Sequence, residues 1–163
     1  MGPPPALLRP RCYRPAAVTD RTSSRGVTTA ERAVIAQQLG RTPRDLTGVA
    51  VRCPFGHPVV IETAPILSDG TPNPTLLYLT CPTLSAAVSR VEAGGGVRAF
   101  KDAVRDDPFL REVLEQIAAL YRARRTALLE PSAGRASARL GAGVGGPASP
   151  EQASCLHAYA AAL

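Results

Sequence analysis

The sequence predicts an α+β fold in which a small antiparallel sheet of about three strands packs against four to five helices. Two observations lead to this prediction. Short runs of β-branched and other apolar residues, separated by turn residues, are confined to the first half of the chain. Apolar residues at helical spacing fill the second half. Strands followed by a run of helices are typical of α+β rather than doubly wound α/β proteins.

The first half of the chain carries one helix signal and three strand signals. Thr28 and Glu31 have the spacing of a capping box, and Gly40 is typical of a helix end. Strands are expected at residues 49–51, 59–61 and 75–80. Two prolines and a glycine between the first two runs predict the turn of a hairpin.

The second half carries four helix signals. Pro82 and Pro108 suit the first position of a helix, and Asp107 precedes the latter as a cap. A run of three glycines separates the helix of Pro82 from a shorter one that begins near Val97. A last helix is expected over residues 149–163.

Two of these helices carry an apolar stripe at helical spacing. The first stripe comprises Leu84, Ala87, Val88 and Val91. The second comprises Leu110, Val113, Leu114, Ile117 and Tyr121. Such a stripe is more often core. On the longer helix it could instead bind a partner helix, which would make the protein a non-catalytic adaptor.

The charge is unevenly distributed along the chain. The net charge is +6, and of the 19 basic residues only Lys101 is not Arg. Residues 1–27 hold five Arg against one Asp, without apolar periodicity, which predicts a disordered basic tail. Residues 28–163 are expected to form a single domain with a flexible Gly/Ala-rich linker at 132–148. This domain is nearly neutral, which argues against nucleic-acid binding.

Composition also indicates which protein classes and which cellular location are expected. No apolar run approaches the roughly 20 residues of a membrane span. Four Cys in 163 residues are too few for a disulfide scaffold, so reduced thiols and a cytoplasmic location are expected. No Walker or Rossmann glycine pattern is present, and the sequence identifies no cofactor.

Five segments carry a family resemblance. They are QQLGRTPR at 37–44, RCPFGHP at 52–58, DGTPNPTLLYLTCP at 69–82, SRVEAGG at 89–95 and CLHA at 155–158. In order and spacing, residues 28–163 resemble an actinobacterial family, domain of unknown function 501. The resemblance implies a cytosolic housekeeping setting, because such genes often lie beside those of a septum-formation initiator and an exopolyphosphatase-like protein. This chain departs from the family at Ala118 and Ala162, where members usually carry His.

Cysteine and histidine occur in two close pairs, Cys53 with His57 and Cys155 with His157. Thiolate and imidazole suit Zn²⁺, so the four could bind one ion. In a regular helix, however, two residues turn the chain by about 200°, which would point Cys155 and His157 to opposite sides. We therefore assign no metal ligands. The catalytic candidates are the thiols of Cys53, beside Arg52, and Cys155, with His157 as base; the alternative is that the thiols pack in the core.

An anion site is the remaining candidate. The polar segment before the third strand offers hydroxyl groups, and arginines could supply charge. The predicted ligand-binding residues are Arg52, Thr71, Thr75, Tyr78 and Arg90. We expect a small-ligand-binding protein or a thiol-dependent enzyme acting on an anionic metabolite, with its site where residues 52–58, 71–78 and 155–157 meet. The alternatives are a rigid surface loop and an adaptor linked to cell division. The sequence does not decide whether the protein is an enzyme.

Overall fold

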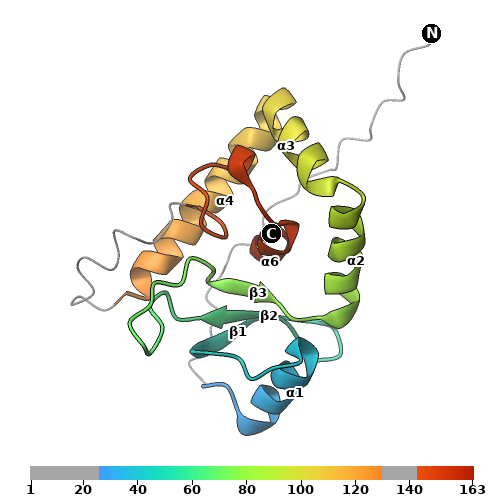
Figure 1. Ribbon diagram of the computed structural model, residues 1–163. Coiled ribbons are helices and arrows are strands. Elements are labelled where there is room, and N and C mark those ends of the chain that lie inside the picture. Colours follow the sequence, from blue (N-terminus) through green and yellow to red (C-terminus); the bar gives the residue numbers. More distant parts are fainter. Residues whose placement is uncertain (1–25, 130–142) are drawn as a thin grey trace.

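Three antiparallel strands and five α-helices make up most of the described part of the chain, which covers residues 26–129 and 143–163 in a computed structural model (Figure 1). The predicted α+β class is confirmed. The elements are α1 (Thr29–Leu39), β1 (Leu46–Arg52), β2 (Pro58–Thr63), β3 (Leu77–Leu79), α2 (Pro82–Ala93), α3 (Gly96–Asp106), α4 (Pro108–Ala127), the 3₁₀ turn η1 (Pro150–Gln152) and α6 (Leu156–Ala162). None of the described helices is long and apolar enough to cross a membrane.

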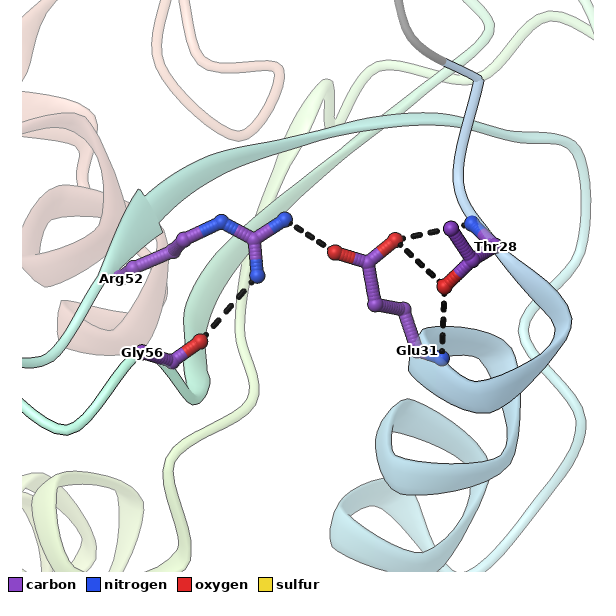
Figure 2. Close-up of polar contacts among 4 residues, drawn as sticks. All are labelled: Thr28, Glu31, Arg52 and Gly56. Carbon is purple, nitrogen blue, oxygen red and sulfur yellow. Dashed lines mark hydrogen bonds and ion pairs between the residues drawn. The ribbon is translucent and has the colours of Figure 1, made fainter.

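Helix α1 begins and ends where its sequence signals predict. The Thr28 hydroxyl accepts a hydrogen bond from the Glu31 N–H at 3.2 Å, and the Glu31 carboxylate accepts one from the Thr28 N–H at 2.8 Å. Gly40 ends the helix in the left-handed region at φ 66°. Figure 2 shows Glu31 between Thr28 and Arg52, whose guanidinium also pairs with this carboxylate. The capping box is thereby joined to the end of β1.

We expect Glu31→Gln to lower the free energy of unfolding by about 1 kcal/mol at neutral pH, because it weakens charge-assisted hydrogen bonds. The Thr28 N–H, the Thr28 hydroxyl and Arg52 lower the pKa of Glu31 below its ordinary value. A depressed carboxyl pKa contributes stability above the unfolded-state pKa that is lost as the pH falls. The difference in free energy of unfolding between the wild-type and Glu31→Gln proteins should therefore shrink as the pH falls. Urea titrations at several pH values would measure this difference. Glu115→Gln is the control on an exposed helix position; a gap that widens in acid would contradict the prediction.

The sheet has the order β1-β2-β3, and both pairs are antiparallel. The hairpin of β1 and β2 is confirmed, with Val49 opposite Ile61. Both strands extend beyond the predicted limits, whereas β3 is shorter. Ile61 is also opposite Tyr78 on β3. The register therefore brings apolar side chains of all three strands onto one face.

Two apolar clusters lie on opposite faces of the sheet. The smaller has Ile35, Leu46 and Ile61 at its centre, where α1 covers β1 and β2. The larger contains Leu76, Val104, Leu114, Tyr121, Val144, Ala153 and Tyr159, and joins β3 to α3, α4 and α6. Adjacent strand residues alternate between faces, so Leu77 packs against the larger cluster and Tyr78 against the smaller. Figure 1 shows α6 above β3, between α2 and α4.

The stripe predicted on α2 does not enter the core. None of its residues is buried; Leu84 and Val91 remain 46% and 55% exposed. The reason is that α2 turns a polar face toward α6, described below. The stripe on α4 does become core, with Leu114 and Tyr121 buried.

Two arginines at the end of α4 have internal partners instead of lying on a solvated helix face. Arg124 donates two hydrogen bonds to the Glu62 carboxylate, at 2.6 and 3.1 Å. The buried Arg125 donates to the carbonyl oxygens of Pro74 and Gly143, at 2.7 and 3.3 Å. These contacts attach α4 to the sheet and to the segment that leads into η1.

The domain limits remain predictions. Residues 1–25 of the predicted tail and residues 132–142 of the predicted linker lie outside the described part of the chain. Val27, at the end of the predicted tail, packs against the smaller cluster. Residues 143–148 turn back onto the fold, where Val144 is 1% exposed.

Candidate functional site

The predicted last helix is interrupted, and the interruption brings Cys155 and His157 together. Instead of a continuous helix, η1 ends at Gln152 and α6 begins only at Leu156. Cys155 is the N-cap in extended conformation, with φ −153° and ψ 126°. The helical turn that would separate the side chains is therefore absent, and Cys155 Sγ lies 3.7 Å from His157 Nδ1.

Glu92, on the last turn of α2, is the third member of this group. Its Oε2 lies 3.2 Å from His157 Nδ1, and its Oε1 accepts a hydrogen bond from the Leu156 N–H at the start of α6. Burial alone would raise the pKa of Glu92, but the Leu156 N–H and the neighbouring His157 outweigh it, so this pKa is lowered. Glu92 therefore stays a carboxylate at neutral pH. The sequence reasoning did not identify it.

The other ring nitrogen of His157 faces the backbone of α2. His157 Nε2 lies 3.2 Å from the Ser85 carbonyl oxygen and 3.3 Å from Ser89 Oγ. Ser85, Ser89 and Glu92 are spaced i, i+4 and i+7, which places them on one helix face. This polar face of α2 meets α6 while its apolar residues Leu84 and Val91 stay exposed. Ser85 and Glu92 are half-buried, as are Ala87 and Val88, whereas Ser89 is exposed at the edge of the contact. A helix that turns two polar side chains toward α6 and leaves Leu84 and Val91 outside favours a site over core packing alone.

A cavity of about 280 Å³ opens beside this group, between α6, β3 and the segment before η1. Its lining residues are Thr75, Leu77, Tyr78, Leu79, Val144, Gly145, Ser154, Cys155, His157, Ala158 and Tyr159. Most of this lining is apolar, with few polar groups, as is usual for small-molecule sites. Two of the predicted ligand-binding residues, Thr75 and Tyr78, thus meet Cys155 and His157. The ring of Tyr78 belongs to the opposite face of the sheet, so its backbone borders this cavity.

Comparison with known proteins places this architecture in a family. The family model described as "Protein of unknown function (DUF501)" matches residues 49–163. The chain belongs to this family. Helix α1 and the start of β1 precede the matched range. Searches of curated proteins and of solved structures found no significant match.

In this DUF501 chain, four other predicted site residues do not line the cavity. Arg52 pairs with Glu31 and donates a hydrogen bond to the Gly56 carbonyl oxygen at 3.2 Å, so it closes the hairpin turn (Figure 2). Cys53 is half-buried beside that turn, and its N–H donates to the His57 carbonyl oxygen. The turn contacts α1 and not the cavity. The contact includes a hydrogen bond of 2.9 Å that Gln38 of α1 donates to the Pro58 carbonyl oxygen.

Thr71 and Arg90 are the remaining two. Thr71 is exposed in the loop before β3, and its N–H donates to Asp69 Oδ1. Arg90 is exposed in the last turn of α2. The geometry offers no support for a ligand-binding role of either residue beside Cys155 and His157. Of the predicted Thr71–Tyr78 segment, only Thr75, Leu77 and Tyr78 border the cavity with Cys155 and His157. The Arg52–Pro58 turn lies apart from it.

A second cavity of about 300 Å³ lies on the α1 side of the sheet. It is more polar, and it is lined by Leu39, Arg41, Pro43, Arg44, Ile61, Thr63, Leu67, Asn73 and Tyr78. The arginines near the Asp69–Thr75 loop are thus Arg41 and Arg44 rather than the predicted Arg52 and Arg90. Arg44 already pairs with Asp69 at 2.6 Å.

The two positions where this DUF501 chain departs from the expected histidines are packing positions. Ala118 is buried on α4, and Ala162 packs against the larger cluster from α6. Neither lines the cavity beside Cys155. The chemistry available to the site therefore comes from Glu92, Cys155 and His157.

Proposed function

We propose that this DUF501 protein binds a small molecule in the cavity between α6 and β3. One observation supports the proposal above all: the thiol of Cys155 and the imidazole of His157, brought together by the interruption before α6, line an otherwise mainly apolar cavity. Apolar walls with a few convergent polar groups are the usual composition of a metabolite site. The proposed setting is an actinobacterial cytoplasm, where the free thiols of Cys53, Cys81 and Cys155 would stay reduced.

A thiol-dependent enzyme is the second candidate, and a separate observation favours it. With Nε2–H donating to the Ser85 carbonyl oxygen, His157 would present its Nδ1 to the Cys155 thiol, which is the arrangement of a nucleophile and its base. The substrate would enter from the same cavity. This candidate requires that the sulfur of Cys155 be free to attack.

The surface proposed for an adaptor packs within the chain and is not available to a partner helix. The α4 stripe proposed for a partner helix packs within the chain, with Leu114 and Tyr121 in the larger cluster. Phe109 and Leu120 remain exposed on α4, at 74% and 56%, but they lie outside that stripe. An adaptor linked to cell division would need another surface, so it ranks below the small-molecule site.

Filling the mouth of the cavity tests the proposal. Ser154 lines the cavity and is exposed, so Ser154→Trp adds bulk there without disturbing the core. We expect ligand-observed NMR with a library of small carboxylates, phosphates and neutral metabolites to find a compound that binds with a Kd below ~1 mM. Ser154→Trp should weaken its binding at least tenfold.

Gln152→Trp is the matched control, because Gln152 is also exposed, lies two residues away and does not line the cavity. It should leave the affinity unchanged. A library without any binder, or a binder that Ser154→Trp does not affect, would refute the proposed site.

A further inference from the structure

We propose that Glu92, Cys155 and His157 bind a divalent metal ion, and that Zn²⁺ is the ion their ligand atoms fit best. One oxygen, one sulfur and one nitrogen atom of these residues all lie within 4.8 Å of one another. The inference deepens the proposed small-molecule site, because the metal would give that site a positive charge. It differs from the zinc set considered from sequence, since Glu92 takes the place of Cys53 and His57.

Two of the three separations between the ligand atoms match those of tetrahedral zinc. Zn²⁺ binds sulfur at about 2.3 Å and nitrogen or oxygen at about 2.1 Å. Tetrahedral angles then put sulfur and nitrogen about 3.6 Å apart, and nitrogen and oxygen about 3.4 Å apart. The corresponding separations are 3.7 Å for Cys155 Sγ and His157 Nδ1, and 3.2 Å for His157 Nδ1 and Glu92 Oε2. The third separation, between Cys155 Sγ and the Glu92 oxygen, is at most 4.8 Å against about 3.6 Å in a tetrahedral site, so an ion would draw these two atoms together by no more than about 1.2 Å.

The backbone of α2 orients the histidine for this role. A carbonyl oxygen only accepts hydrogen bonds, so the 3.2 Å contact with the Ser85 carbonyl assigns a proton to His157 Nε2. By the same reasoning Nδ1 carries a proton while it faces the Glu92 carboxylate, and a metal ion would displace that proton and bind the Nδ1 lone pair between Glu92 and Cys155. Histidine ligands commonly donate their other ring N–H to a carbonyl oxygen or carboxylate in this way. The Leu156 N–H similarly holds the Glu92 carboxylate in place.

Three protein ligands leave a fourth tetrahedral position open, which is typical of catalytic rather than structural zinc. Cys155 and His157 line the cavity, so the fourth ligand would come from that side. Among the described residues that line the cavity, none is Lys or Arg. The metal would therefore be the cation that selects an anionic ligand, such as a carboxylate or phosphate.

Metal analysis of tag-free protein tests the inference. After equilibration with Zn²⁺ and removal of excess ion, we expect about one zinc per chain. Glu92→Gln, Cys155→Ser and His157→Ala should each weaken zinc binding at least tenfold. Cys53→Ser and His57→Ala are matched controls, because the chain has only two His and these two residues lie at the hairpin turn. Both controls should retain the zinc.

Two measurements keep the test independent of variant folding. Co²⁺ added to the wild-type chain should give the intense visible absorption of a tetrahedral thiolate site. Zn²⁺ should also slow the alkylation of Cys155 by iodoacetamide at least tenfold relative to Cys53. The inference would be overturned if the wild-type chain stayed metal-free in excess Zn²⁺. It would also be overturned if the two control variants lost zinc to the same extent as the ligand variants. Unchanged alkylation of Cys155 would overturn it as well and leave the thiol-enzyme candidate.

Zinc is measured here without any small molecule. A failure of this experiment is thereby distinguishable from a failure of the cavity, which the Ser154→Trp comparison measures on its own.

Discussion

Replacing Arg124 with methionine is expected to lower the free energy of unfolding by about 3 kcal/mol. The Glu62 side chain that Arg124 contacts is 7% exposed. Losing the guanidinium leaves a buried carboxylate whose remaining side-chain hydrogen bond, among the described residues, comes from the Thr47 hydroxyl. Breaking a buried ion pair by removing one partner costs about 3–5 kcal/mol. Arg124 is one-third exposed, and this places the expected loss at the lower end.

A double-mutant cycle measures the pair directly. Glu62→Gln removes the charge that Arg124 neutralises. The loss in free energy of unfolding of the Arg124→Met/Glu62→Gln double variant should therefore be about 2 kcal/mol smaller than the sum of the losses in the two single variants. Arg98→Met serves as the control, because its side chain is 91% exposed, and it should cost less than about 0.5 kcal/mol. Additive single changes in urea unfolding would show that the two side chains are not coupled.

Replacing Tyr121 with phenylalanine is expected to cost about 2 kcal/mol, although it removes a single oxygen atom. That oxygen accepts a hydrogen bond of 2.6 Å from the Leu76 N–H, at a position where both residues are buried. An orphaned buried donor loses the full desolvation energy, about 1–3 kcal/mol, whereas an average hydrogen bond contributes about 1 kcal/mol. Burial also raises the pKa of Tyr121, as expected for a phenol removed from water.

Tyr159 provides the matched control. It is 4% exposed in the same cluster, and its hydroxyl forms no hydrogen bond with any described residue. Tyr159→Phe should therefore cost less than about 0.5 kcal/mol. Equal midpoints for the two variants in thermal unfolding would mean that the contact between Tyr121 and Leu76 contributes no net stability.

The sequence predicted most of the fold because the signals involved are local. The capping box of Thr28 and Glu31 and the cap at Asp107 act within three residues, and both are present as expected. The hairpin between β1 and β2 follows from a turn marked by Pro and Gly. Such signals do not depend on how distant segments pack, so one sequence is enough to recognise them.

The site depends on long-range packing, and for that reason only part of it could be predicted. Cys155 and His157 were recognised by residue type, but residues 151–163 contain no Gly or Pro to mark the interruption before α6. That interruption arises from tertiary contacts: Ala153 is fully buried in the larger cluster, and Glu92 accepts the Leu156 N–H. Glu92 is 64 positions from Leu156, so no spacing rule connects them. Likewise, the distant Glu62 gives Arg124 an internal role that its position on α4 does not reveal.

The segment that carries the site also completes the core. Residues 143–163 supply Val144, Ala153 and Tyr159, three of the seven buried residues of the larger cluster. Removal of residues 143–163 would therefore unfold the described core as well as remove the proposed site. Substitution of Cys155 or His157, which are not among the buried residues of the larger cluster, would instead alter the proposed site and leave the fold in place.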